Sequence, residues 1–291
     1  MQSKRDLAII LKSIPYEERN RIVTALTETH GVVSALARNA IQSRRFGGTL
    51  EAFVASEWTF VEKPGTELLR LEEAVIRRAY DGIRADFDLL SVASVMNELM
   101  LKVAPKHEPC PDLFRLHANA LAYLEETALK GKKSQPLKAP GALNIETLAL
   151  LNGYMTKLLQ WSGNQPQLEH CLGCETSISH MQKNQSLNCV INDAGWICAN
   201  CRSSDTQHVR DREGLGFRHA SLRVTPAAIR DFQMSMHLPI RQIPTAAEAS
   251  VREHQDLFKF LEALAIFHLP GFEQKPLKSM RFIELESVLP H

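Results

Sequence analysis

The 291 residues include 34 Lys or Arg and 33 Asp or Glu, so the net charge of +1 does not by itself indicate a nucleic-acid partner. With 44% hydrophobic and 23% charged residues, the composition is that of a globular protein with room for two or three domains. The apolar run at residues 7–11 is too short for a signal-peptide core, and no apolar segment approaches the roughly 20 residues that span a bilayer, so no membrane partner is expected.

The first 80 residues predict β structure, because Val, Ile and Thr are concentrated in short runs separated by turn signals. The turns fall at His30-Gly31, Gly47-Gly48 and Lys63-Pro64-Gly65. The expected strands are residues 6–12, 21–27, 32–38, 51–61 and 68–71. A small closed barrel accommodates such short strands most economically, and the oligonucleotide-binding (OB) barrel is the commonest of this size.

From residue 86 onward the apolar positions recur at helical spacing. Helices are expected to begin near Asp86, at Pro111, near Asn144 and at Thr225-Pro226. Thr245 and Glu248 match a capping box for a last long helix that ends at Pro270-Gly271. Residues 131–141, rich in lysine and with two prolines, predict an exposed loop. The expected fold class is α+β and multidomain, with an OB barrel at 1–80 and a helical domain at 81–291.

Two Cys-x-x-Cys pairs, Cys171 with Cys174 and Cys198 with Cys201, predict a metal site inside the helical domain, in an insertion at residues 168–204. Each pair can form a tight turn that presents two thiolates, and four thiolates suit one tetrahedral zinc ion. A closed four-thiolate site leaves no position for water, so the predicted zinc is structural. Redox-active or merely buried cysteine pairs are the alternative, and Cys189 and His170 are spare ligands.

The six cysteines are more consistent with a reducing cytosol than with a disulfide framework, which predicts a cytoplasmic protein. Catalytic signatures do not emerge from the sequence. Gly131-Lys132-Lys133-Ser134 resembles the end of a phosphate-binding loop, but position 126 is Glu where that loop needs glycine. We therefore expect a protein that is not an enzyme and does not bind a nucleoside triphosphate.

Local charge is more informative than total charge. Over residues 1–50 there are eight Lys or Arg against four Asp or Glu, and the stretch from Gly31 to Leu50 has no acidic residue. Such a face attracts phosphates, and an aromatic side chain beside it could stack on a base. The candidate DNA-binding residues are Lys12, Arg19, Arg21, Arg38, Arg44, Arg45 and Phe46. The alternative is a solvated loop with a buried Phe46.

Several segments, in this order, resemble the RecO family of bacterial recombination mediators and DNA-repair proteins. The N-terminal ones are Ala8-Ile-Ile-Leu-Lys12, Tyr16-Glu-Glu-Arg-Asn-Arg21, His30-Gly31 and Ser43-Arg44-Arg45-Phe46-Gly47-Gly48. A helical block, the cysteine pairs and Leu277-Lys-Ser-Met-Arg281-Phe282 then follow, so the resemblance covers essentially the whole chain.

The resemblance implies an N-terminal OB domain, a helical domain and a zinc knuckle that many members carry. It also implies binding of single- and double-stranded DNA, annealing of complementary strands, and a nucleoid-associated role in the cytoplasm. The implied partners are RecR and the acidic C-terminal tail of single-stranded-DNA-binding protein (SSB), with which such proteins load recombinase onto coated strands. Two other interpretations remain: a zinc-ribbon OB factor acting on RNA or in transcription, and an RNA-modifying enzyme that uses a paired cysteine.

Overall fold

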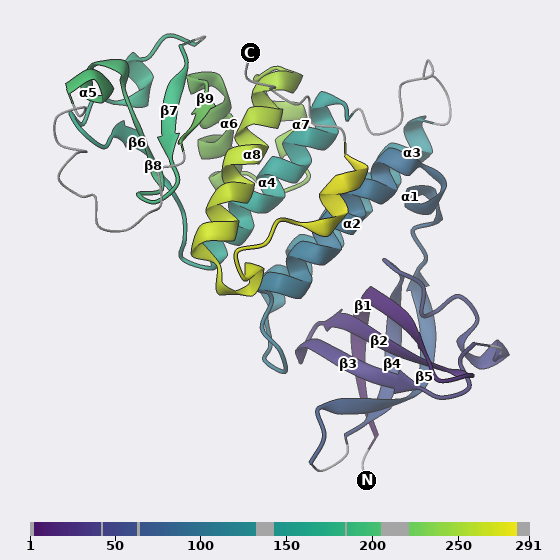
Figure 1. Cartoon of the computed structure of the whole chain (residues 1–291). Coiled ribbons are helices and arrows are strands. Elements are labelled where there is room, and N and C mark those ends of the chain that lie inside the picture. Colours follow the sequence, from purple (N-terminus) through teal and green to yellow (C-terminus); the bar gives the residue numbers. More distant parts are fainter. Residues whose placement is uncertain are drawn as a thin grey trace. The chain divides into compact units, whose positions relative to one another are not determined.

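The computed structural model describes residues 3–41, 43–62, 65–131, 143–183, 185–204 and 221–283. The chain forms two compact units (Figure 1). One comprises Met1–Gly141 with Leu277–Ile283, and the other comprises Ala142–Pro276 with Glu284–His291. Most of the loop expected at 131–141, and Lys63-Pro64 of the turn expected at 63–65, lie outside the described residues.

The first unit begins with the predicted five-stranded closed barrel, which is therefore confirmed. Its strands are β1 (Ser3–Tyr16), β2 (Asn20–Thr27), β3 (Gly31–Ala37), β4 (Ala55–Val61) and β5 (Leu68–Arg78). They close in the order β1-β2-β3-β5-β4, with β3 and β5 parallel and the other pairs antiparallel. The barrel interior is filled by Trp58, Phe60, Ile10 and small residues of β2 and β3, so it is a packed OB-like core.

Three strands differ clearly from the expected bounds. The strand predicted at 6–12 is longer at both ends, since β1 runs from Ser3 to Tyr16. The strand predicted at 51–61 begins only at Ala55, because Val54 and Phe53 exchange backbone hydrogen bonds with Ile10 of β1 and Phe53 has a positive φ of 73°. A short 3-10 helix, η1 (Arg44–Phe46), precedes this turn. In contrast, β5 continues to Arg78, well beyond the expected end at residue 71.

Helices α1 (Asp81–Ala85), α2 (Phe87–Val103) and α3 (Pro111–Gly131) complete this unit, together with the 3-10 helix η5 (Lys278–Phe282). The expected N-terminus of α2 is confirmed, since the Asp86 carboxylate accepts the backbone N–H groups of Asp88 and Leu89. Asn97 of α2 donates to the carbonyls of Ile10 and Leu11 in β1, at 3.2 and 2.9 Å. The barrel and α2 are thereby joined by buried hydrogen bonds.

The second unit contains α4 (Ile145–Trp161), α6 (Pro226–His237), α7 (Ile243–Ala246), α8 (Val251–His268) and the 3-10 helix η4 (Pro270–Phe272). Asn144 and Thr225 cap α4 and α6 as expected. The capping box predicted at Thr245 and Glu248 is wrong, because Ser250 and Glu253 form it. The backbone N–H of Glu248 is instead donated to the buried Asp231 carboxylate.

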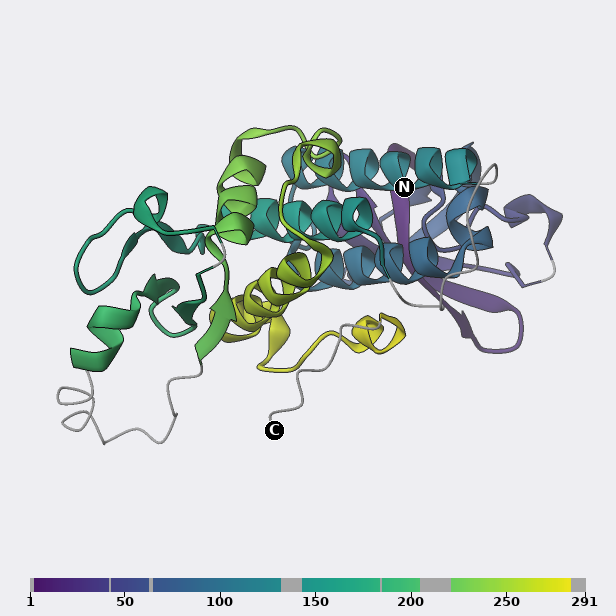
Figure 2. The same cartoon turned by 90° about the horizontal axis from the view of Figure 1, so that it is seen from above.

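The cysteine-rich part of the second unit is a small sheet and not only a loop between helices (Figure 2). Its strands are β6 (Gln167–Cys171), β7 (Leu187–Val190), β8 (Gly195–Ile197) and β9 (Ser221–Val224), in the order β6-β8-β7-β9. The short helices η2 (Ile178–His180) and α5 (Ala199–Ser204) lie between them in sequence. Among the described residues, none of the helices has the length and apolar character needed to cross a membrane.

Candidate metal centre and nucleic-acid interface

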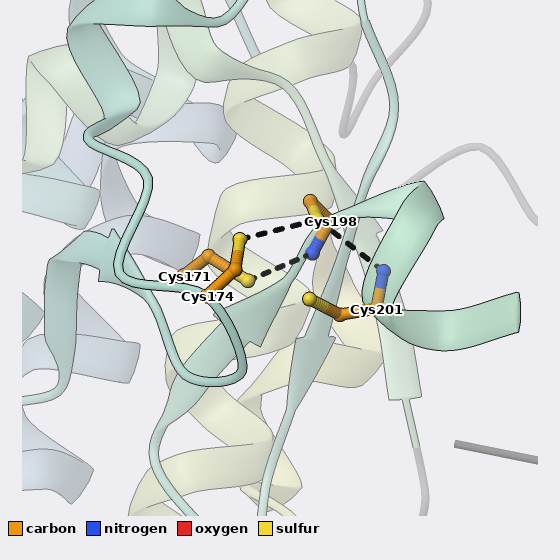
Figure 3. Close-up of side chains that lie close together, drawn as sticks. All are labelled: Cys171, Cys174, Cys198 and Cys201. Atoms are coloured by element: carbon orange, nitrogen blue, oxygen red, sulfur yellow. Dashed lines mark hydrogen bonds between the residues drawn. The ribbon is translucent and has the colours of Figure 1, made fainter. Parts of the chain in front are cut away.

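The four cysteines of the two predicted pairs meet in space (Figure 3). Their sulfur atoms all lie within 4.8 Å of one another, and the sulfurs of Cys174 and Cys198 are 3.7 Å apart. A tetrahedral zinc ion with Zn–S bonds of about 2.3 Å requires sulfurs about 3.8 Å apart. Cys171 ends β6 and Cys198 follows β8, and these two strands pair, so the sheet brings the two turns together.

The backbone of both turns is arranged around the sulfurs. The N–H groups of Gly173 and Cys198 donate to the Cys171 sulfur at 3.4 and 3.3 Å, and the Cys201 N–H donates to Cys198 at 3.5 Å. Such donors stabilise thiolates, the form that binds metal. A Cβ at position 173 would lie 2.9 Å from the Cys201 sulfur, so glycine is required for this approach.

The thiols influence one another's protonation strongly. Hydrogen bonds from Thr176 lower the pKa of Cys174 to about 6, whereas hydrogen bonding with Cys174 and Cys198 raises the pKa of Cys201 to about 12. Ionising Cys201 beside the Cys174 thiolate is therefore unfavourable, and a bound cation would offset this cost. The distances and the donor set fit a metal ion held by four sulfurs.

The spare ligands Cys189 and His170 do not belong to the four-sulfur group. Cys189 is fully buried in β7 opposite Trp196, and burial raises the pKa of its thiol. His170 is exposed and forms a β-bridge with Ser177. The geometry therefore favours Cys171, Cys174, Cys198 and Cys201 as the ligand set.

The predicted DNA-binding residues separate into groups on the barrel. Directly opposite residues on neighbouring strands point to the same face. Lys12 lies opposite Thr24 and Thr24 opposite Ser34, while Ile14, Ile22 and Leu36 form the next row. Val23, Ala25, Ala35 and Ala37 alternate with these and are buried in the barrel core, so both rows face outward. We call the outward side of β1, β2 and β3 the outer face.

Lys12, Arg19 and Arg38 are exposed at this face or at its end. Arg19 lies in the β1–β2 turn, and Arg38 follows Ala37, which is paired with Arg21 of β2. Arg21 alternates with the outward-facing Ile22 and so points to the other side of β2. Its Nε donates to the Ser13 hydroxyl at 2.9 Å, and its Nη1 lies 3.6 Å from the Glu51 carboxylate.

The stacking role expected for Phe46 is contradicted by its burial. Phe46 is 3% exposed and belongs to the barrel core, because η1 turns the ring inward. The guanidinium of exposed Arg45 lies over this ring, 5.4 Å from its centre. The side chain of Arg44 lies outside the described part of the structure. Tyr16, an exposed aromatic residue that is not among the candidate DNA-binding residues, is the last residue of β1.

Comparisons with known proteins agree with this architecture. The family profile described as "Recombination protein O N terminal" matches residues 1–80, and "Recombination protein O C terminal" matches residues 84–134. A DNA repair protein RecO of Anaeromyxobacter sp. (strain K) is 30% identical over 194 residues, which cover 66% of this chain and 68% of that protein. A DNA repair protein RecO of Cutibacterium acnes is 28% identical over 259 residues, covering 88% and 96%. One of Bacillus pumilus is 30% identical over 198 residues, covering 68% of each.

The fold and the site define a protein in which an OB-like barrel precedes helices and a four-cysteine metal-type centre. The chain belongs to the RecO family of DNA repair and recombination proteins.

Proposed function

We propose that this protein is a recombination mediator that binds single- and double-stranded DNA through its barrel and anneals complementary strands. In an OB barrel, the face of strands 2 and 3 and the loop between strands 1 and 2 bind oligonucleotides. Here Arg19 lies in the β1–β2 loop, Arg38 directly follows β3, and Lys12 of β1 lies opposite Thr24 of β2. This arrangement is the observation that carries the proposal. We include Arg21 and exposed Arg45 as further phosphate contacts, and Arg44 on the ground of its sequence position beside Arg45.

The mediator acts with RecR to load recombinase onto strands coated by SSB, whose acidic C-terminal tail it binds. These two partners rest on the resemblance to the RecO family and on the family membership. Positioning two strands side by side needs no bond to be made or broken in the protein, so the proposed activity has no catalytic step and uses no nucleoside triphosphate. Repair of chromosomal DNA places the protein in the cytoplasm at the nucleoid.

The proposed metal is one zinc ion on Cys171, Cys174, Cys198 and Cys201, as a structural element of the second unit. It would fix the two cysteine turns relative to β6 and β8. It would bind the four thiolates and take part in no reaction.

The test is annealing of two complementary fluorescent oligonucleotides without ATP, with bare strands and with SSB-coated strands plus RecR. We expect the protein to accelerate duplex formation in both settings. Annealing no faster than in protein-free solution, together with preferential binding of RNA over DNA of the same sequence, would support the RNA-binding OB factor instead.

A further inference from the structure

Tyr16 is an exposed aromatic residue at the end of the outer face. It is the last residue of β1, pairs with Asn20 of β2 and is 43% exposed. Ile14, two residues earlier on the same side of the strand, is 41% exposed. Some binding surfaces expose a row of large apolar side chains beside cations. Such surfaces suit a ligand that has both flat apolar faces and negative charge.

Hydrogen bonds hold this end of the barrel in place. The Asn20 side chain donates to Glu17 at 2.7 Å and accepts the backbone N–H of Asn39 at 3.0 Å. The backbone N–H of Ile41 donates to the carbonyl of Arg19 at 3.1 Å. The β1–β2 turn is thus joined to the segment after β3. Tyr16, Arg19 and the residues next to Arg38 are held in one arrangement before any ligand arrives.

Charge at this end is only moderately positive. Glu17 and Glu18 lie in the β1–β2 turn beside Arg19, although Glu17 accepts a hydrogen bond from Asn20. Arg38, after β3, is the second cation at this end. Phosphate attraction alone is therefore limited here, and a useful affinity needs a contribution that does not depend on charge. Stacking of a base on an aromatic ring supplies such a contribution and tolerates any sequence.

We propose that Tyr16 is a base-stacking platform for single-stranded DNA, with Arg19 and Arg38 holding the adjacent phosphates. This inference rests on the proposed DNA binding, and it adds that the protein recognises the base of the nucleotide as well as its phosphate. A single strand can present the faces of its bases to Tyr16, whereas a duplex has them stacked internally. The subsite therefore favours single strands over duplex, which suits a protein that holds a strand ready for pairing.

The experiment compares an oligothymidylate with an oligonucleotide of equal length whose central residues are abasic, by fluorescence anisotropy. Wild type is expected to bind the abasic strand about five- to a hundredfold more weakly, the range for loss of a stacked base. Tyr16→Ala should bind the oligothymidylate more weakly by a similar factor and should no longer distinguish the two strands. Tyr16→Phe, which keeps the ring, should restore the distinction.

Val75→Ala is the matched control, since Val75 is 47% exposed on β5 and lies outside the proposed site. It should bind as wild type does. If Tyr16→Ala discriminates between the two strands as well as wild type does, the stacking inference is overturned while DNA binding stands. If wild type binds neither strand, the proposed function itself fails. Equal melting temperatures of wild type and Tyr16→Ala show that the comparison is made on folded protein.

Discussion

The carboxylate of Glu98 in α2 accepts hydrogen bonds from the hydroxyl and the backbone N–H of Ser279, at 2.7 and 2.8 Å. It also accepts the backbone N–H of Lys278 at 2.9 Å. These two positions are about 180 residues apart in sequence, yet both belong to the first unit. The hydrogen bonds lower the pKa of Glu98 despite partial burial, which would raise it. The Leu277–Phe282 segment is thereby anchored to α2.

Glu98→Ala should release this anchor, at a cost of about 1.5–3 kcal/mol for hydrogen bonds to a charged group. Ser279→Ala removes only the hydroxyl donor and should cost less. Hydrogen exchange at the amides of Lys278 and Ser279 is the measurement, and both amides should exchange faster in Glu98→Ala. Unchanged exchange there would mean that other contacts hold the segment.

Gly31 and Gly65 provide a matched pair for testing a close backbone approach in the barrel. Both have positive φ, 63° and 78°, but a Cβ at position 31 would lie 2.1 Å from the Glu108 carbonyl oxygen, whereas Gly65 has open space around it. Gly65→Ala should lower the free energy of unfolding by about 1–2 kcal/mol, because alanine disfavours the left-handed conformation. Gly31→Ala adds a collision with backbone and should cost about 2–5 kcal/mol in all. Equal losses in chemical denaturation would contradict the packing of Gly31 against the α2–α3 connection.

The metal centre predicts linked losses of metal and stability. Cys198→Ser should lower both the zinc content and the melting temperature, since binding energy at a structural site is folding energy. A loss of about 3 kcal/mol corresponds to roughly 10 °C in a unit of this size. Cys189→Ser should destabilise through burial of a hydroxyl in β7 but retain one zinc per chain. Zinc retained by Cys198→Ser and lost by Cys189→Ser would show that the ligand set is different.

The buried Asp231 carboxylate predicts acid sensitivity of the second unit. Burial raises its pKa, but the His254 ring 3.3 Å away and the hydrogen bonds that Asp231 accepts from the N–H groups of Ala249 and Glu248 lower it more, so the net pKa lies below the ordinary value. Because the unfolded chain then binds the proton more readily, the stabilisation is present above about pH 4 and is lost as pH falls further.

Asp231→Asn should therefore lower the melting temperature at pH 7 and flatten its decline between about pH 5 and pH 3. Asp193→Asn, at an exposed site, should reproduce the wild-type profile. Thermal unfolding followed by circular dichroism across this range checks both variants. A decline in Asp231→Asn as steep as in wild type would assign the acid sensitivity to other groups.

Local chemistry made part of this structure predictable. The caps at Asp86, Asn144 and Thr225 are set by residues within one turn of the helix, and the cysteine spacing alone suggested the four-sulfur group. The failures depend on distant residues. Ser250-x-x-Glu253 and Thr245-x-x-Glu248 match the same capping pattern, and Asp231 decides between them by accepting the Glu248 N–H.

The same limit explains the DNA-binding surface. Phe46 beside two arginines is a reasonable stacking candidate by sequence, but its burial follows from how η1 packs on the barrel. Whether Lys12, Tyr16 and Arg38 share a face depends on strand register and on the bulge between Ile10 and Lys12. Neither the register nor the position of the bulge can be obtained from residue spacing along one strand.

The central claim is that the outer face of the barrel binds single-stranded DNA through Arg19 and Arg38. A salt titration of fluorescent single-stranded DNA binding tests it directly, because each phosphate contact contributes about −0.7 to the slope of log affinity against log salt. Arg19→Ala with Arg38→Ala should reduce the slope by about 1.4 and weaken all sequences alike. Arg77→Ala with Arg78→Ala, which removes equal charge from β5, should leave the slope unchanged. Superimposable titrations of wild type and the Arg19/Arg38 variant would contradict the account.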